Sequence, residues 1–155
     1  MEVFADVRQV FKGALGIRIS GTDWVEGGWT IDETCTLATR VKQAGAQFVH
    51  ISSGGVSPLQ KITLGPEYQV PLAKAVKERS DLTTFAVGLI TEPAQAEAIL
   101  AEGQADLVLV GREVLRNPYW PLQAAQALAE PPPYPLQYLR SLPAGAKAPE
   151  RKKPA

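Results

Sequence analysis

The sequence predicts an α/β protein built on a parallel sheet with helices packed against it. Three observations support this fold class. Short apolar runs alternate four times with longer segments that have the spacing of amphipathic helices. The runs are apolar along nearly their whole length, as is typical of strands in a parallel sheet covered by helices. Glycine, proline and capping residues mark the boundaries of the helices.

The expected strands are short and end in turns that contain glycine or serine. They lie at residues 15–20, 47–53, 82–87 and 106–110. Helices precede and follow these strands. The first ends at Gly13, and the others are expected at residues 32–44, 66–79, 91–103 and 112–129. Because the carboxyl ends of parallel strands share one edge of the sheet, we expect a ligand site at that edge.

Two of the helices have well-marked starts and ends. Asp32 is the expected N-cap of the second helix, and Gly45 follows the end of that helix. Thr91 is expected to cap the fourth helix, because Pro93 then falls in its first turn. Gly103 ends this helix.

The bulk composition excludes several functional classes. The chain has 155 residues, of which 16 are basic and 16 acidic, and neither a basic face nor a charge run favours nucleic acid or a membrane surface. No apolar stretch reaches the roughly 18 residues of a membrane span. The single cysteine, Cys35, rules out an internal disulfide. With no signal peptide expected, these features favour a cytoplasmic protein.

Composition changes near residue 131. Seven of the thirteen prolines lie in the last 25 residues. We therefore expect three parts: a folded unit over residues 1–130, an extended segment over 131–142 that is a candidate subunit contact, and a disordered tail over 143–155.

The segment 105–118 (ADLVLVGREVLRNP) indicates a phosphate site. It is expected to form a buried strand that runs into Gly111 and Arg112 and then into a helix. Glycine lets the backbone approach an anion, helix amides point at it, and a guanidinium binds two of its oxygens. Gly88 stands in a second such turn after the preceding strand. In (β/α)8 barrels the loops after the last two strands commonly share one phosphate. Gly88, Gly111 and Arg112 are therefore predicted to bind a phosphate-bearing ligand.

Three other polar features each allow two interpretations. Arg18 either contacts an anion or cofactor at the carboxyl edge of the sheet, or forms an ion pair with Asp23 or Glu26. Residues 52–55 (SSGG) either bind a ligand or form a flexible turn. His50, the only histidine, is interpreted as a hydrogen-bonded structural residue rather than a catalyst. One histidine and one cysteine predict no metal site.

Four segments of the chain resemble, in order, the C-terminal half of the Old Yellow Enzyme family. These segments are LGIRISGTDW, VHISSGG, TFAVGLIT and ADLVLVGREVLRNPYWPLQAA, and together they span nearly all of residues 1–130. The family comprises FMN-dependent NAD(P)H dehydrogenases and ene-reductases built on a (β/α)8 barrel. A whole barrel needs about 250 residues. The resemblance therefore implies a parallel (βα)4 half of a TIM (β/α)8 barrel, with strands that correspond to the fifth to eighth.

The resemblance also implies roles for individual residues. Arg18 matches the arginine that contacts the pyrimidine edge of the flavin, where a fixed cation stabilises the charge of the reduced ring. Gly88, Gly111 and Arg112 match the positions that bind the FMN phosphate. Arg140, in the segment QYLR, matches an arginine of the thermophilic-like branch that reaches into a neighbouring subunit's active site. The alternative for Arg140 is an exposed residue in a loose tail.

The activity implied by the resemblance is the reduction of activated C=C bonds. Hydride passes from NAD(P)H to FMN and then to a small activated alkene or quinone. In the family, the first four strands supply the substrate-binding pair and the proton-donating tyrosine, so we assign no catalytic residue here. The chain is expected to be an incomplete enzyme, either truncated, split or excised, that needs an N-terminal half-barrel as its partner.

Two alternatives remain at this point. The chain is either a non-catalytic half-barrel that self-associates as a homo-oligomer and binds a phosphate-bearing ligand or a partner, or a relative of another flavoenzyme barrel. Self-association would pair the exposed edge strands of two copies. The second alternative includes dihydroorotate dehydrogenase and dihydrouridine synthase relatives, which the GREVLRNP and QYLR segments disfavour.

Overall fold

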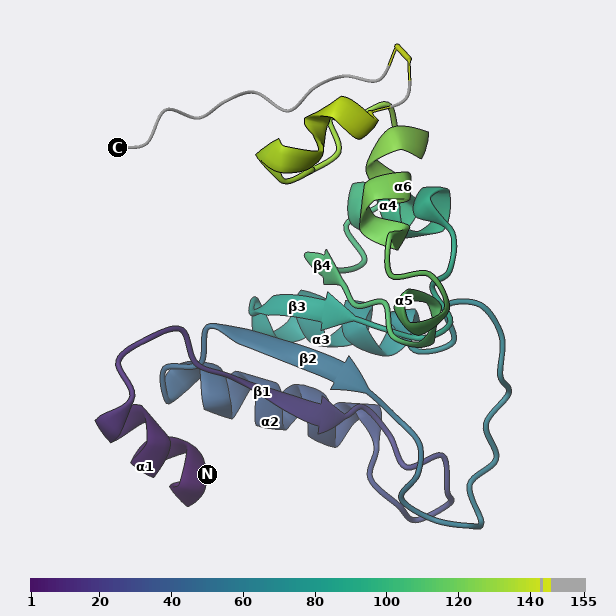
Figure 1. Cartoon of the computed structure of the whole chain (residues 1–155). Helices are drawn as coiled ribbons and strands as arrows, with labels where there is room; N and C mark the ends of the chain where they lie inside the picture. The colour runs from purple at the N-terminus through teal and green to yellow at the C-terminus, as the bar shows by residue number, and fades with distance from the viewer. Residues whose placement is uncertain (143, 146–155) are drawn as a thin grey trace.

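The centre of the fold is one sheet of four parallel strands in the order β1-β2-β3-β4. The structure is a computed structural model that describes residues 1–142, 144 and 145. The strands are β1 (Gly16–Ser20), β2 (Phe48–Ser52), β3 (Thr83–Ala86) and β4 (Leu107–Val108). Because consecutive strands are neighbours joined by helices, the predicted α/β fold class with a parallel sheet is confirmed (Figure 1).

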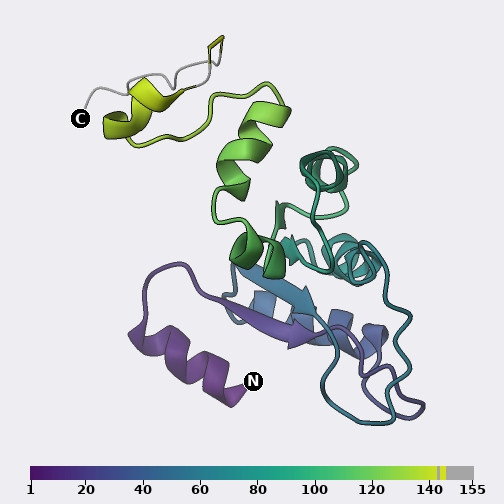
Figure 2. The same cartoon turned by 45° about the vertical axis from the view of Figure 1, so that its right-hand side comes forward.

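Helices lie before, between and after these strands. They are α1 (Glu2–Val10), α2 (Ile31–Gln43), α3 (Val70–Ser80), α4 (Pro93–Ala101), α5 (Arg112–Arg116), α6 (Trp120–Ala127) and the 3-10 helix η1 (Leu136–Ser141). In Figures 1 and 2, α2 and α3 lie side by side along the sheet, and η1 lies beyond α6. None of the helices in the described residues has both the length and the apolar character that a bilayer crossing requires.

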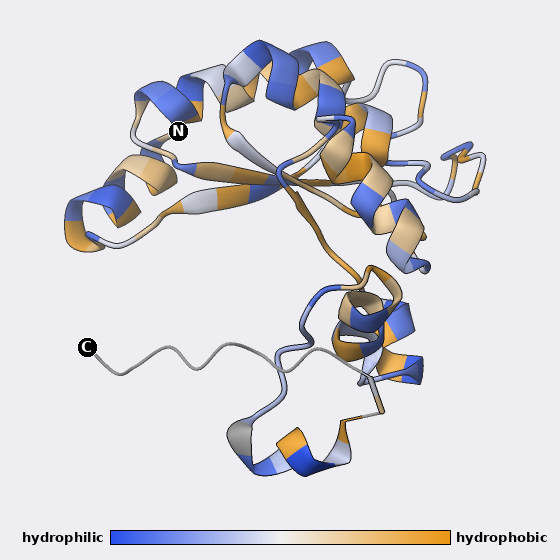
Figure 3. Cartoon of the chain, turned by 90° about the horizontal axis from the view of Figure 1, so that it is seen from above, coloured by the Kyte–Doolittle hydropathy of each residue, from blue (hydrophilic) through white to orange (hydrophobic). Residues whose placement is uncertain are grey.

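The two faces of the sheet differ sharply in burial. Successive strand residues point to opposite faces, so polar and apolar residues alternate along the strands (Figure 3). On the helix-covered face, Val49, Ile51 and Ala86 are each 0% exposed. We call the other side the open face, and its residues are only half-buried or exposed. It carries Arg18, Phe48, His50, Ser52, Phe85 and Leu107.

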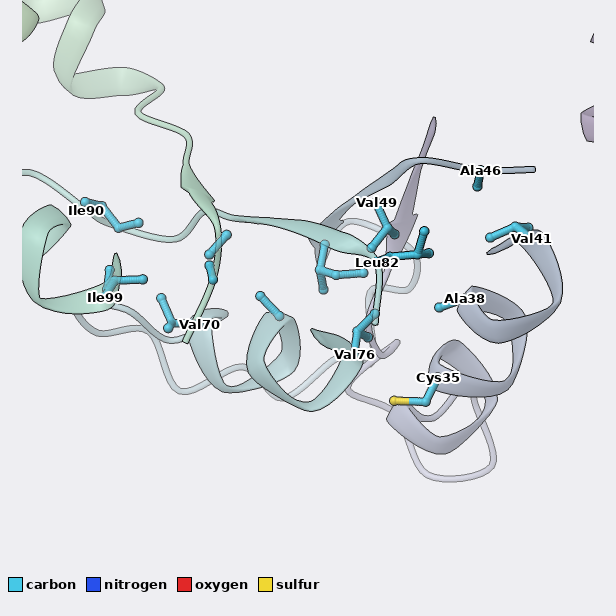
Figure 4. Packing of buried hydrophobic residues seen from close by; sticks show 14 of the residues in the cluster. Cys35, Ala38, Val41, Ala46, Val49, Val70, Val76, Leu82, Ile90 and Ile99 are labelled. Carbon is cyan, nitrogen blue, oxygen red and sulfur yellow. The ribbon is translucent and has the colours of Figure 1, made fainter. Parts of the chain in front are cut away.

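The hydrophobic core lies between the helix-covered face and the helices. Ala38 of α2 and Val76 of α3 are fully buried and belong to one cluster with the strand residue Val49 (Figure 4). Phe4 of α1 joins this cluster at its edge and is 9% exposed. The fold therefore has a core on one side of its sheet, and the open face contributes little to it.

The C-terminal end of the sheet differs from the sequence expectation. The strand expected at residues 106–110 is reduced to Leu107–Val108, and the helix expected at residues 112–129 is divided into α5 and α6. Pro118 explains the division. Proline disfavours a helical conformation at the preceding residue and has no backbone N–H to donate. Accordingly, Asn117 adopts φ −135° and ψ 86°.

Two helix starts also shift by one or two residues. Thr30, not Asp32, is the N-cap of α2, because its side chain accepts a hydrogen bond from the Glu33 backbone N–H. The Glu33 side chain accepts one in return from the Thr30 backbone, completing a capping box. Glu92, not Thr91, is the N-cap of α4, and its backbone N–H donates to the Gln95 side chain.

Two longer segments also depart from their expected conformations. The helix expected at residues 66–79 begins only at Val70, because Glu67 has a left-handed φ of 64° that interrupts a helix. The segment 131–142, expected to be extended, contains η1 in the proline-free stretch LQYLRS. The tail expected at residues 143–155 lies almost entirely outside the described residues.

Candidate functional site

A pocket of about 250 Å³ opens at the carboxyl ends of β3 and β4, and we call it the rim pocket. Its lining includes Gly88 from the loop after β3 and Gly111 and Arg112 from the turn into α5. Gly88 lies more than twenty positions before the adjacent Gly111 and Arg112 in the sequence, and the fold brings all three to one cavity. Their common role in binding a phosphate remains a prediction.

Gly88 forms a wall of the rim pocket where a larger residue would not fit. Its φ of 131° lies in a region that residues with a Cβ rarely adopt, and an added Cβ would lie 3.1 Å from the backbone nitrogen of Gln69. The Gly88 carbonyl accepts a hydrogen bond of 2.8 Å from the Glu67 backbone N–H. The main chain at Gly88 is therefore fixed in place and packs closely against Gln69.

Of the two guanidinium groups that line the rim pocket, one has no partner among the described residues. Arg116 also lines the pocket, but its side chain is paired with the carboxylate of Glu113. The side chain of Arg112 makes no ion pair or hydrogen bond with any residue that the structure describes. Because Arg116 and Glu113 neutralise one another, Arg112 leaves the pocket with a net positive charge. Such a site favours an anion with at least two oxygens.

Backbone donors also remain free around the rim pocket. Among the described residues, the N–H groups of Leu89, Ile90, Gly111 and Arg112 donate to no protein acceptor. Free N–H groups on loops are suited to bind anionic oxygens. Because α5 has only five residues, its helix amides contribute less to anion binding than we expected from the sequence. The main donors for an anion are the loop N–H groups and the Arg112 guanidinium.

A polar pair that the sequence did not indicate lies beside this pocket. Gln69 lines the rim pocket, and its Oε1 accepts a hydrogen bond of 2.8 Å from the Ser53 hydroxyl. Ser53 follows the end of β2 directly, within the SSGG turn for which a ligand role was one interpretation. Nothing in the local sequence marks Gln69, because its importance arises from burial between segments that lie far apart in the chain.

Arg18 lies on the open face and does not line the rim pocket. Its Nε donates a hydrogen bond of 3.2 Å to the Ser52 hydroxyl. The ion-pair interpretation is wrong, because neither Asp23 nor Glu26 pairs with Arg18 among the described residues. Asp23 accepts a hydrogen bond from the Trp29 backbone N–H instead. The Arg18 guanidinium is therefore exposed and available to a ligand on the open face.

His50 neighbours Arg18 in the strand register. Its Nε2 is buried and has no hydrogen-bond partner among the described residues, which departs from the hydrogen-bonded role we expected. Burial, and secondarily the positive charge of Arg18, lowers the pKa of His50 below its ordinary value of 6.5. His50 is therefore neutral at pH 7, and the charge on the open face is that of Arg18.

Arg140 lies apart from these residues, on η1. Its side chain is exposed, and it does not line the rim pocket. Figure 2 shows η1 beyond α6, away from the sheet. The structure thus brings Gly88, Gly111 and Arg112 together, and Arg18 and Arg140 lie elsewhere.

The size and chemistry of the rim pocket fit a phosphate group with its nearest atoms. Its volume of about 250 Å³ lies below the range of about 300–1,000 Å³ that encloses a drug-sized ligand. Free N–H groups and an unpaired guanidinium are donors suited to a phosphate, and glycine lets the backbone approach it closely. The rest of a phosphate-bearing cofactor would extend beyond this pocket.

Comparison with known proteins identifies the family. The sequence model of the NADH:flavin oxidoreductase / NADH oxidase family matches residues 1–130. The NADPH dehydrogenase of Geobacillus thermodenitrificans is 45% identical over 139 residues, which cover 90% of this chain and 41% of that protein. The NADPH dehydrogenase of Halalkalibacterium halodurans is 44% identical over 140 residues with the same coverage. The chain thus spans about two fifths of the length of these relatives.

A solved structure of a related fold agrees with the half-barrel architecture. The 2-naphthoyl-CoA reductase in complex with 2-naphthoyl-CoA superposes with a TM-score of 0.73 and 26% sequence identity. The match covers 81% of this chain and only 20% of that one. The predicted half-barrel and the resemblance to the Old Yellow Enzyme family are both confirmed. This chain belongs to the NADH:flavin oxidoreductase / NADH oxidase family.

Proposed function

We propose that this chain supplies the phosphate-binding part of the FMN site in an NAD(P)H-dependent flavin oxidoreductase. FMN is the cofactor of the family, and a nicotinamide is its reductant. The observation that carries the proposal is the meeting of Gly88, Gly111 and Arg112 at the rim pocket. Each of these residues was selected from the sequence for its phosphate chemistry, independently of the pocket.

The residues of this chain bind and orient the cofactor rather than react with it. Bound FMN supplies hydride transfer between the nicotinamide and the substrate. Arg112 and the free N–H groups of the neighbouring loops hold the phosphate, and Gly88 allows its close approach. The Arg18 side chain is oriented by its hydrogen bond to the Ser52 hydroxyl. Its positive charge lies at the pyrimidine edge of the ring and stabilises negative charge there.

The reaction that we propose is the reduction of an activated C=C bond in a small alkene or quinone, an ene-reductase activity. The chain spans only 41% of its NADPH dehydrogenase relatives. We assign the substrate-binding pair and the proton donor to an N-terminal half-barrel, which would complete the enzyme by covering the open face. Arg140 then contacts a neighbouring subunit, and the assembly acts in the cytoplasm.

The uncovered aromatic residues favour a second candidate function. Phe48 and Phe85 stack on the open face with ring centroids 5.1 Å apart, and Leu107 is 43% exposed. A non-catalytic half-barrel would cover these residues with a second copy of the chain. Native mass spectrometry separates the candidates. A stable dimer that binds no FMN favours the second, and a chain that binds FMN stoichiometrically favours the first.

The test of the proposed function compares Arg112→Ala with His50→Ala in FMN titrations followed by flavin fluorescence. Arg112→Ala removes the free guanidinium and should raise the Kd for FMN by about tenfold to a hundredfold, since hydrogen bonds to charged groups contribute roughly 1.5–3 kcal/mol. His50→Ala, on the open face, should change the Kd much less. Equal affinities for the parent and both variants would contradict the proposal.

A further inference from the structure

We propose that Gln69 is a ligand-binding residue of the rim pocket, donating a hydrogen bond from its amide Nε2 to an oxygen of the bound phosphate. The inference rests on the proposed function, because it concerns how the same phosphate is held. No motif marks Gln69 in the sequence, and its role follows from its place in the fold.

The protein satisfies the side-chain amide of Gln69 on one side. The residue is only 4% exposed, although it precedes α3 at the edge of the sheet. Buried polar side chains almost always have hydrogen-bond partners, since an unpaired group loses its interaction with water. The Oε1 atom has such a partner in the Ser53 hydroxyl, at 2.8 Å. The Nε2 atom has no hydrogen-bond partner among the described residues and is not one of their fully buried unpaired atoms, so its two N–H groups are accessible to a ligand.

The hydrogen bond from Ser53 determines which way the amide faces. A hydroxyl that donates to Oε1 places the oxygen toward the end of β2, and the nitrogen then lies on the other side. There, Nε2 lies 3.1 Å from the position that a Cβ on Gly88 would occupy. The donor therefore lies against the bare main chain of Gly88, on the wall of the rim pocket.

The backbone around Gln69 is held rigidly at this position. The Glu67 N–H donates to the Gly88 carbonyl at 2.8 Å, and the Val70 N–H donates to the Glu67 carbonyl at 2.8 Å. These bonds join the turn before α3 to the end of β3, and the side-chain bond joins it to the end of β2. Gln69 thus presents a preorganised neutral donor, which loses little conformational entropy when a ligand binds.

A phosphate oxygen is the acceptor that this arrangement favours. The pocket already offers the Arg112 guanidinium and free backbone N–H groups, which are all donors. Its one carboxylate, that of Glu113, is paired with Arg116. An anion with several oxygens accepts from all these donors at once, whereas a cation or an apolar group would leave them unpaired.

The decisive variant is Gln69→Met, which preserves the length of the side chain and removes the donor. FMN and riboflavin are titrated against the parent and the variant, with flavin fluorescence as the readout. Riboflavin lacks the phosphate, so the ratio of the two affinities reports on the phosphate alone. We expect the variant to bind FMN about tenfold to a hundredfold more weakly and riboflavin with unchanged affinity. Gln43→Met, at an exposed position that ends α2, is the matched control.

The outcomes of this titration distinguish a failure of the role of Gln69 from a failure of the proposed function. A parent that prefers FMN, with a folded Gln69→Met variant that keeps the same preference, overturns the role of Gln69 and leaves the proposed function intact. A parent without any preference for FMN overturns both.

Ser53→Ala provides a second variant should Gln69→Met fail to fold. It keeps the amide and removes the hydroxyl that orients it. Its preference for FMN over riboflavin should fall several-fold, and an unchanged preference would again overturn the inference.

Discussion

The two faces of the sheet are made from the same strands, yet they serve different purposes. On the helix-covered face, Val49, Ile51 and Ala86 are completely buried against α2 and α3. On the open face, Arg18 is exposed, and His50 and Phe85 are half-buried. A residue shifted by one position along a strand therefore moves from a packed core to a partly exposed surface.

This difference shows which part of the protein is complete within the chain. The core between sheet and helices is packed from residues that this chain supplies on both sides. The open face carries Arg18 and stacked aromatic rings whose proposed partners are FMN and further barrel strands. The rim pocket lies at the carboxyl ends of β3 and β4, and this chain contributes Gly88, Gly111 and Arg112 to it.

The largest effect is expected on the free energy of unfolding, when a substitution in the core is compared with one on the open face. Ile51→Ala creates a cavity at a position that is 0% exposed, so we expect it to lower the free energy of unfolding by about 2–5 kcal/mol. Leu107→Ala on the open face, where the side chain is 43% exposed, should cost less than about 1.5 kcal/mol. Urea denaturation of both variants measures the difference. Equal losses would mean that the open face is as well packed as the core.

A smaller effect is expected at the rim, where backbone geometry matters more than packing. Gly88→Ala forces a Cβ into a strained region of φ and to within 3.1 Å of Gln69. We expect it to lower the free energy of unfolding by about 1–3 kcal/mol.

Gly65→Ala is the control for this substitution. An added Cβ there meets no atom within 4 Å, and its φ is not in the left-handed region. Thermal unfolding followed by circular dichroism compares the two variants. A Gly88→Ala variant as stable as Gly65→Ala would show that the rim is not fixed as the structure describes.

The smallest expected effect concerns the pH dependence of stability. Burial, then the charge of Arg18, lowers the pKa of His50 in the folded state, so the unfolded chain binds the proton more tightly. Stability is therefore present above the unfolded pKa of about 6.5 and decreases as the pH falls below it. His50→Leu should abolish this decrease between pH 7 and pH 5.

Urea midpoints measured across this range test the assignment. His50 is the only histidine in the chain. The lowered pKa values of Asp81 and Asp106 start from 3.8, so these carboxylates contribute to the pH dependence mainly at lower pH. A variant with the same slope as the parent would show that another group is responsible.

The sequence predicted the parts of the fold that depend on local pattern. The apolar strands, the helices that follow them, and the glycines and arginine at the ends of β3 and β4 were all recognisable, because parallel strands bring their carboxyl ends together. Pro118 was also visible in the sequence, but we expected one helix to continue through it. The N-cap at Thr30 was missed because Asp32 is an equally good capping residue.

The parts that could not be predicted depend on contacts between distant segments. Gln69 and Ser53 meet across the ends of two elements, and no spacing rule indicates such a pair. The same is true of the hydrogen bond from Arg18 to Ser52, since the sequence offered Asp23 and Glu26 as closer partners along the chain. Local sequence cannot rank these alternatives, because the choice depends on strand register and loop geometry.

The most direct test of the account is the affinity of the unmodified chain for FMN relative to riboflavin. The two ligands differ only in the phosphate, which the rim pocket is proposed to hold without help from any other chain. The account predicts that FMN binds stoichiometrically and at least about a hundredfold more tightly than riboflavin, as expected when several charge-assisted hydrogen bonds are lost together. Equal affinities for the two ligands, or no binding of FMN by the folded chain, would contradict it.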